Sequence, residues 1–414
     1  MRAPENLIND VNDSILLHLI RERGSIARRD LAKLTRLNPS TITRITNRLI
    51  QAGFLRESGQ GDKDKQKVGR KPVLLEINPR GGYLVGMDIG AWKIKVVIVD
   101  LTLQPLYRLS VLTQPRGEKD SILDRAFLLM ERAIDKCGIE KEKIKGIGIG
   151  ISGSVDNVRG ICSFAPNLDG WRDVPVKDLF EKKFKIQTFV TNCMTVMALG
   201  EKYYGEAKET HLRDLICINL GEGIGSGIIL QDELLLSSAT KHVGNIGHMT
   251  VEKGGPVCGC GKRGCLEAIA GGRALARQAV EAVKKGVPTL IKDLVKGDTE
   301  KISAETVAKA AQMGDTLALN LLGRAGRHIG SVVAILMQLY YPEKIILGGG
   351  LIKAGEPLLD PLIETIKEWI VEEELKKVEI TTSKLGEYAG ALGATRLVSH
   401  EVFKTPLLHL IRRA

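Results

Sequence analysis

The sequence predicts a chain of two unlike parts: a small helical head that ends in a hairpin, and a larger α/β region with two lobes. Two observations lead to this prediction. Helical periodicity fills residues 9–53 and gives way to a charged hairpin over 54–77. Strand–turn–strand patterns then occur twice, at 83–101 and at 215–230, which indicates a duplicated α/β lobe with a cleft between the copies.

The head is predicted to begin with two helices. The first, over residues 9–24, carries an apolar stripe made of Val11, Ile15, Leu16, Leu19 and Ile20. Gly24 marks its end. A short second helix over 27–37 is expected to turn Leu31 and Leu34 inward.

A third helix is predicted to begin after Asn38, a good N-cap, with Pro39 at the first helical position. Ile42, Ile45 and Leu49 fall on one of its faces. Short polar and guanidinium side chains lie largely on the other: Ser40, Thr41, Thr43, Arg44, Asn47 and Arg48. Such groups are typical of a helix that contacts base edges and phosphates, although a helical bundle that binds protein is the alternative.

The hairpin completes a winged helix-turn-helix. Its predicted strands, 54–58 and 72–77, flank a charged tip that contains Arg70 and Lys71. Gly69 before them and Pro72 after them would let Arg70 enter a narrow minor groove, whereas the alternative is a flexible basic tip. Residues 1–80 hold 16 Lys and Arg against 9 Asp and Glu, so most of the net charge of +11 lies here, which favours a polyanionic partner.

The α/β region reads as buried strands, glycine turns and helices. Strands are predicted at 83–90, 93–101, 106–113 and 144–152, with a helix over 121–138. A last strand–turn–helix unit over 343–370 carries three consecutive glycines, Gly348, Gly349 and Gly350. Glycine turns of this kind can offer backbone N–H groups to a phosphate, although a tight turn is the commoner explanation for each one alone.

Three of the seven cysteines form a cluster in residues 245–267, NIGHMTVEKGGPVCGCGKRGCLE. Thiolates of Cys258, Cys260 and Cys265 with the imidazole of His248 make a Cys₃His set, suited to tetrahedral Zn²⁺ in a closed structural site. A redox-active thiol cluster is the alternative. The other four cysteines are scattered singly and are expected to be small core residues.

The region after the head resembles the ROK family of repressors, open reading frames and sugar kinases. The matching stretches are MDIGAWK (87–93), APNLDGW (165–171), TNCMTVMALGE (191–201), NLGEGIGSG (219–227), GNIGHM (244–249) and CGCGKRGCLE (258–267). A winged helix-turn-helix ahead of this region is the layout of the family's repressor branch, which includes xylose- and N-acetylglucosamine-responsive regulators. The resemblance implies an actin-like (ribonuclease H-like) two-lobed sugar-kinase fold.

The expected domains are a DNA-binding head at 1–79, a first lobe at 80–205 completed by a C-terminal helix at about 388–414, and a second lobe with the zinc site at 206–387. By resemblance, the sugar ligands are Asn167, Asn192, Asn245, His248 and Glu267. Asn245 stands where the family usually has Glu, so an altered sugar preference is expected. A pocket that binds no sugar, in a lobe that serves only for dimerisation, is the alternative.

Kinase chemistry is not expected. The family's general base would be an Asp at the position of Cys193, and a thiol is a poor base for an alcohol. Trp92 stands in place of a phosphate-binding hydroxyl, and Glu222 replaces a Thr in the second phosphate loop, where a carboxylate would repel phosphate. We therefore expect no catalytic residues and no bound ATP.

The sequence thus predicts a sugar-responsive repressor of carbohydrate-utilisation genes that binds operator DNA as a homodimer, with pairing into tetramers left open. The rival is an active ROK sugar kinase of the hexokinase or glucokinase type. A third hypothesis has a phosphosugar or a transport protein as effector. The longest apolar run, 331–341, is shorter than the roughly 20 residues of a membrane span, so no membrane insertion and a cytoplasmic location are expected.

Overall fold

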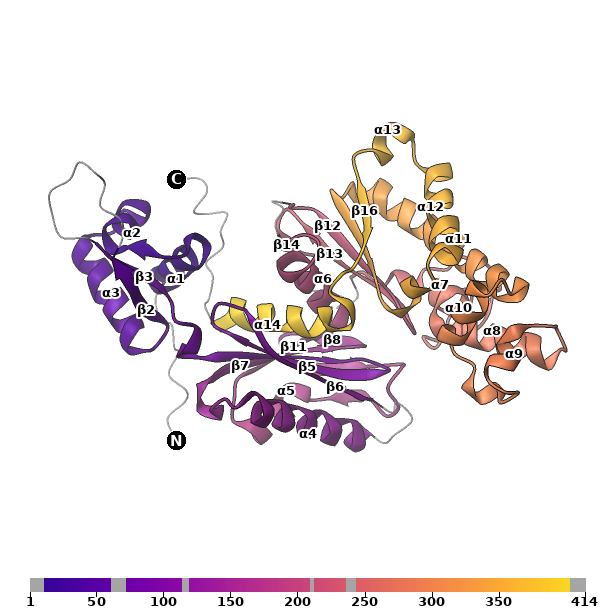
Figure 1. The fold of residues 1–414 in the computed structure, drawn as a ribbon, viewed down its shortest axis with the longest axis horizontal. Helices are drawn as coiled ribbons and strands as arrows, with labels where there is room; N and C mark the ends of the chain where they lie inside the picture. The colour runs from indigo at the N-terminus through magenta and orange to yellow at the C-terminus, as the bar shows by residue number, and fades with distance from the viewer. Residues whose placement is uncertain (1–10, 61–71, 114–118, 209–211, 236–242, 403–414) are drawn as a thin grey trace.

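The protein forms a head and two lobes, arranged from left to right in Figure 1. The computed structural model describes residues 11–60, 72–113, 119–208, 212–235 and 243–402. In the described residues, no helix is both long enough and apolar enough to cross a membrane.

The head is a winged helix-turn-helix, as predicted. Its elements are α1 (Val11–Arg23), β1 (Ile26–Ala27), α2 (Arg28–Thr35), α3 (Pro39–Gln51), β2 (Leu55–Gln60) and β3 (Val73–Ile77). The three strands form one sheet in the order β1-β3-β2, and the two-residue strand β1 was not predicted. The wing tip with Arg70 and Lys71 lies outside the described residues.

The core of the head differs from the predicted stripes in two places. Leu31 is fully buried, but Leu34 is 44% exposed, because it lies in the last turn of α2, just before Arg36 turns the chain in a left-handed conformation. Val11, the first residue of α1, is 63% exposed, and Leu17 is buried instead. The predicted apolar face of α3, which consists of Ile42, Ile45 and Leu49, is fully buried.

Polar contacts from two side chains of the other helices fix α3 within the head. Asp13 of α1 is buried and forms an ion pair with Arg48 of α3. Arg28, the first residue of α2, donates to Thr46 Oγ1 at 3.0 Å and to Asn47 Oδ1 at 3.3 Å, and its guanidinium also reaches Glu57 of β2 at 3.3 Å. Asn38 is at the N-cap position as predicted, but its side chain makes no capping bond.

The first lobe is built on a five-stranded sheet in the order β11-β7-β4-β5-β6. The strands are β4 (Tyr83–Ile89), β5 (Lys93–Asp100), β6 (Pro105–Leu112), β7 (Ile144–Ile151) and β11 (Thr188–Asn192). Helices α4 (Lys119–Cys137) and α5 (Val176–Phe184) cover one face, and the C-terminal helix α14 (Ala389–Val402) covers the other (Figure 1). A small sheet of β8 (Ser154–Asp156), β9 (Ile161–Phe164) and β10 (Arg172–Val174) adjoins this lobe.

The second lobe repeats this sheet. Its order is β14-β13-β12-β15-β16, from β12 (Leu215–Leu220), β13 (Ile224–Leu230), β14 (Glu233–Leu234), β15 (Lys344–Gly348) and β16 (Glu379–Thr382). In each lobe the first three strands are antiparallel neighbours, and the last two extend the other side of the first strand in parallel. The predicted duplication is therefore confirmed, strand by strand.

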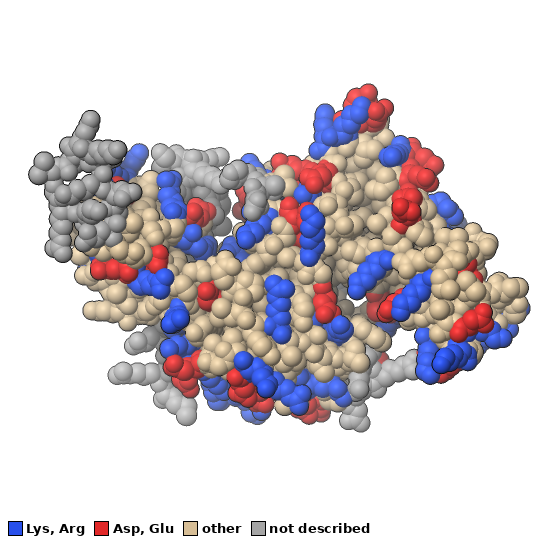
Figure 2. Space-filling view, viewed as in Figure 1, with Lys and Arg blue, Asp and Glu red and all other residues tan. Residues whose placement is uncertain are grey.

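Helices of the second lobe pack around its sheet and form the largest core cluster. They are α7 (Leu266–Ala270), α8 (Gly272–Lys284), α9 (Leu290–Leu294), α10 (Ala304–Gln312), α11 (Thr316–Tyr340), α12 (Glu356–Trp369) and α13 (Glu372–Leu375). Between the two sheets lies α6 (Cys193–Tyr204), which contacts strands of both. The surface is hollowed between the lobes, with charged side chains of both signs at the edge (Figure 2).

We predict that Arg48→Ala destabilises the head, because it leaves the buried carboxylate of Asp13 without its cation. The expected loss is about 2 kcal/mol in the free energy of opening of α1 and α3, measured by hydrogen exchange of their amides. The matched control is Arg44→Ala, an exposed arginine of the same helix. It should change the free energy by less than about 0.5 kcal/mol. Equal values for the two variants would contradict the role of the ion pair.

Candidate functional site

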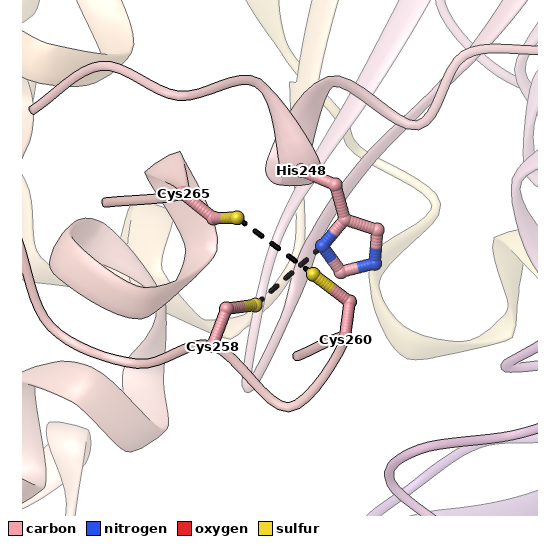
Figure 3. A group of neighbouring side chains, drawn as sticks. All are labelled: His248, Cys258, Cys260 and Cys265. Atoms are coloured by element: carbon pink, nitrogen blue, oxygen red, sulfur yellow. Dashed lines mark hydrogen bonds between the residues drawn. The ribbon is translucent and has the colours of Figure 1, made fainter. Parts of the chain in front are cut away.

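His248, Cys258, Cys260 and Cys265 lie together at one point of the second lobe (Figure 3). Their four donor atoms are all within 4.8 Å of one another. Cys258 Sγ is 3.6 Å from His248 Nδ1, and Cys260 Sγ is 3.8 Å from Cys265 Sγ. The predicted set is therefore assembled by the fold.

The spacing of these donors fits tetrahedral zinc. Ligands at about 2.1 Å (N) and 2.3 Å (S) from a tetrahedral centre stand about 3.5–3.8 Å apart, close to the two separations above. Four protein ligands fill the shell, so the ion would close the loop and hold its ends together. Nδ1 of His248 faces the sulfurs while its other ring nitrogen points away (Figure 3), as a shared role in metal and ligand binding would require.

The local chain explains why the cluster forms. His248 ends the short 3-10 helix η3 (Ile246–His248), and Cys265 is the residue before α7. The loop between them turns at Gly254, Gly261 and Gly264, each with a positive φ. A side chain on Gly264 would collide with the carbonyl oxygen of Glu252, so only glycine fits there.

Glu267 connects the metal cluster to the second glycine loop. It lies two residues after Cys265, in the first turn of α7, and its Oε2 accepts a hydrogen bond from the Ile224 amide at 3.0 Å. A Cβ atom on Gly223 would collide with this same oxygen. The position of Glu267 therefore depends on the fold of the cysteine loop on one side and on the start of β13 on the other.

Asn167 is bound across the cleft by a residue that the sequence reading missed. Arg273, from the first turn of α8, donates to Asn167 Oδ1 at 2.8 Å. Its Nε is 3.8 Å from Glu222 Oε2, so one guanidinium bridges a loop of the first lobe and a loop of the second. Burial raises the pKa of Glu222, and Arg273 acts in the opposite direction. No short motif marks Arg273, because its partner Asn167 is 106 residues away.

Asn192 and Asn245 occupy helix starts. The Asn192 side chain caps α6, since its Oδ1 accepts from the Met194 amide at 2.7 Å, and its Nδ2 donates to the Gly153 carbonyl at 2.6 Å. Asn245 is exposed at the N-cap position of η3 and makes no capping bond with its side chain. Within the described cleft, Asn167 and Glu267 both lie close to Gly223.

Cys193, at the position expected for a base, is half-buried next to an ion pair. Lys95 Nζ is 2.9 Å from Asp88 Oδ2, and both side chains are largely buried. Burial and the Asp88 carboxylate raise the pKa of Cys193 to about 12, against the effect of Lys95. Burial opposes the charge of Lys95, but Asp88 outweighs it and the pKa of the ammonium is raised. At neutral pH this group therefore holds a protonated thiol and a closed ion pair.

Trp92 lies in the turn between β4 and β5 and is 60% exposed. Its carbonyl oxygen accepts a hydrogen bond from the Thr113 amide at 2.9 Å. The side chain stands where the sequence reading expects a phosphate-binding hydroxyl. Indole has no hydroxyl and cannot supply that contact.

The outer surface of the head combines predicted and unpredicted residues. Ser40, Thr43, Arg44, Asn47 and Arg48 are exposed on α3, and Thr41 is half-buried. An open groove of about 580 Å³ runs between α2 and the start of α3, and four cationic residues line it: Arg28, Arg29, Lys33 and Arg36. The predicted DNA-binding set omitted these α2 residues, although a cluster of Lys and Arg in this short segment could have indicated them.

Comparison with known proteins assigns the chain. Residues 84–401 match the ROK family and residues 15–64 match the MarR family. A xylose repressor from Caldicellulosiruptor bescii is 30% identical over 97% of this chain and 98% of its own length. A glucokinase from Thermotoga maritima is 32% identical over 77% of this chain and 98% of its own.

A solved structure covers the whole layout. It is that of a ROK family transcriptional regulator, a homologue of the Escherichia coli MLC protein, with 26% identity and a TM-score of 0.78 over 98% of this chain and 99% of the other. The chain belongs to the ROK family, with a MarR-like head. His248, Cys258, Cys260 and Cys265 form the zinc site typical of that family.

We predict that Cys260→Ser loses the metal. The wild-type chain should contain one zinc per chain, and the variant far less, because three ligands bind Zn²⁺ much more weakly than four. Metal analysis after gel filtration measures this. The matched control is Cys137→Ser, a half-buried single cysteine of the first lobe, which should retain the full zinc content. Full zinc content in Cys260→Ser would contradict the assigned ligand set.

Proposed function

We propose that this ROK chain is a sugar-responsive transcriptional repressor of carbohydrate-utilisation genes. The single observation that carries the proposal is the union, in one chain, of a winged helix-turn-helix with a kinase-like cleft whose base position holds a protonated thiol, that of Cys193. The similarity to a xylose repressor over nearly the full length of both chains supports the same function.

The proposed domains are residues 1–79 for DNA binding, 80–205 with about 388–414 for the first lobe, and 206–387 for the second. The packing of α14 on the first sheet supports the return of the C-terminal segment to the first lobe. We propose Ser40, Thr41, Thr43, Arg44, Asn47, Arg48, Arg70 and Lys71 as DNA-contacting residues.

These residues do not have equal freedom to meet DNA. Arg44 is exposed and lies in the second turn of α3, near the end that would enter a groove. Arg48 is held by Asp13 and Asn47 by Arg28, so both would contact DNA only while keeping these partners. The cationic groove beside α2 is suited to a backbone phosphate. We therefore assign the main sequence contacts to the first two turns of α3.

The proposed effector is a free sugar bound in the cleft by Asn167, Asn192, Asn245, His248 and Glu267. Arg273 already joins the two lobes through its bond to Asn167. A sugar hydroxyl that binds Asn167 would have to join or replace this bond, so the sugar would act directly on a contact between the lobes. Sugar binding would then change the closure of the lobes and, in a homodimer, the spacing of the two DNA heads. The same mechanism would hold if two dimers paired into a tetramer. The protein would act in the cytoplasm on a pseudo-palindromic operator.

The proposal is tested with the DNA upstream of the chain's own gene. We expect tight binding of that fragment, weakened by one member of a panel containing D-xylose, D-glucose and N-acetylglucosamine, as measured by fluorescence anisotropy. Arg44→Ala should lower the affinity by about tenfold, equivalent to 1–3 kcal/mol for a base contact. The control Arg159→Ala removes an exposed arginine of the first lobe and should leave it unchanged. Absence of DNA binding by the wild-type chain would refute the proposal.

The rival function, a ROK sugar kinase, is favoured by the similarity to a glucokinase over 77% of the chain. A coupled assay with Mg-ATP and the same sugar panel separates the two. We expect no turnover up to pH 9. Burial raises the pKa of Cys193 to about 12, so its thiol keeps its proton over this range and cannot accept one from a sugar hydroxyl. Turnover at ordinary kinase rates of about 1–100 per second would instead establish the kinase.

A further inference from the structure

We propose that Arg21 is the positioning residue through which the lobes set the recognition helix α3. The proposal rests on the proposed function, and it concerns how an effector in the cleft reaches the DNA head. The structure contains a series of contacts from Asn192 to Arg48, and in that series Arg21 is the side chain that forms a hydrogen bond between the head and α14.

The series begins in the cleft with α6. Asn192 caps this helix through the Met194 amide, so a ligand that binds Asn192 acts on the helix end directly. Met194 packs against Gly225 of β13, which places this first turn between the lobes. A change in closure between the lobes must therefore move the start of α6 relative to at least one sheet.

From α6 the contact passes to α14 at very short range. A side chain on Gly200 of α6 would collide with the carbonyl oxygen of Ala389, and one on Gly393 of α14 would collide with that of Val196. At the far end of α6, the Tyr204 hydroxyl is 2.8 Å from Thr395 Oγ1, and the Arg396 guanidinium lies 3.7 Å from the Tyr203 ring centroid. Backbone-to-backbone packing of this kind leaves no slack, so the two helices move as one body.

Arg21 connects α14 to the head. Its Nη1 donates to Ser399 Oγ at 3.0 Å, and Ser399 is buried in the last part of α14. The two residues are 378 positions apart in sequence, so this is a contact between the head and the last described helix. Arg21 is half-buried, and this burial together with the nearby Arg396 lowers its pKa to about 10.

Within the head, α1 connects Arg21 to α3. Arg21 and Asp13 are in the same helix, and Asp13 holds Arg48 of α3. A displacement of α14 along its axis would therefore move Ser399, then α1, then the helix that faces DNA. The shared apolar cluster supports this, because it contains Leu16, Leu49, Leu84 and Val398 from the head, the first sheet and α14.

The proposal predicts a loss of sugar response without a loss of DNA binding. For the panel sugar that releases the wild-type chain, saturation should weaken DNA binding by about 5- to 150-fold. In full-length Arg21→Ala and Ser399→Ala this ratio should fall to about threefold or less, while the Kd for DNA without sugar and the Kd for sugar stay within about threefold. Arg21→Lys, which keeps a donor, should recover part of the ratio. Arg23→Ala, an exposed arginine two positions along α1, is the control and should keep the wild-type ratio.

A double-mutant cycle distinguishes one shared contact from two separate effects. If Arg21 and Ser399 act through their bond, the double variant loses no more of the ratio than either single variant. Additive losses, or wild-type ratios in both single variants, would overturn the proposal. Should Arg21→Ala fail to fold by circular dichroism, Ser399→Ala carries the test, since it removes only one hydroxyl.

A second measurement needs no sugar. Coupling is reciprocal, so DNA binding alone should change hydrogen exchange in α6 and α14 of the wild-type chain. In Arg21→Ala the change should persist in α3 and vanish from α6 and α14. An unchanged pattern in the variant refutes the coupling role alone, whereas failure of the wild-type chain to bind its own upstream DNA refutes the proposed function and this inference with it.

Discussion

The close crossing of α6 and α14 fixes the interlobe helix to the first lobe, and the contacts between the cleft and the head run through it. It depends on Gly200 and Gly393, where any side chain would collide with a carbonyl oxygen of the opposite helix. Because α14 also lies on β4 and β7, where Gly86 and Gly148 leave room for its backbone, the last described helix is built into the first lobe. The first sheet and the interlobe helix therefore share α14 as a neighbour, and the DNA head meets the same helix through Arg21 and Ser399.

The part of the cleft around Cys193 balances its charges within the chain. Asp88 keeps its carboxylate but is paired with Lys95, and the neighbouring Cys193 is uncharged at neutral pH. On the opposite loop Glu222 is paired loosely with Arg273. Each charge is thus balanced within the chain. Pairing of this kind stabilises charged groups that are partly withdrawn from water.

The sequence predicted the elements and the metal ligands well, and the long-range polar contacts poorly. Apolar periodicity and glycine turns are local signals, so α3, the paired lobes and the Cys₃His set followed from them. Leu34 was misjudged because periodicity does not tell where a short helix leaves the core. Asp13–Arg48, Asn167–Arg273 and Arg21–Ser399 join residues 35, 106 and 378 positions apart, and nothing in the local sequence of either partner shows that they meet.

The ion pair between Asp13 and Arg48 also limits how much sequence information α3 could extract from DNA. The second half of the helix is occupied with holding the head together, through Arg48 and through the contact of Arg28 with Asn47. Two turns then remain to read bases, enough for roughly three or four base pairs. A sequence of three or four base pairs recurs by chance about every 60 to 260 base pairs on one strand. Specificity for one site in a genome would have to come from a second copy of this half-site, bound by the second head of a dimer, and from the shape of the DNA between the two half-sites.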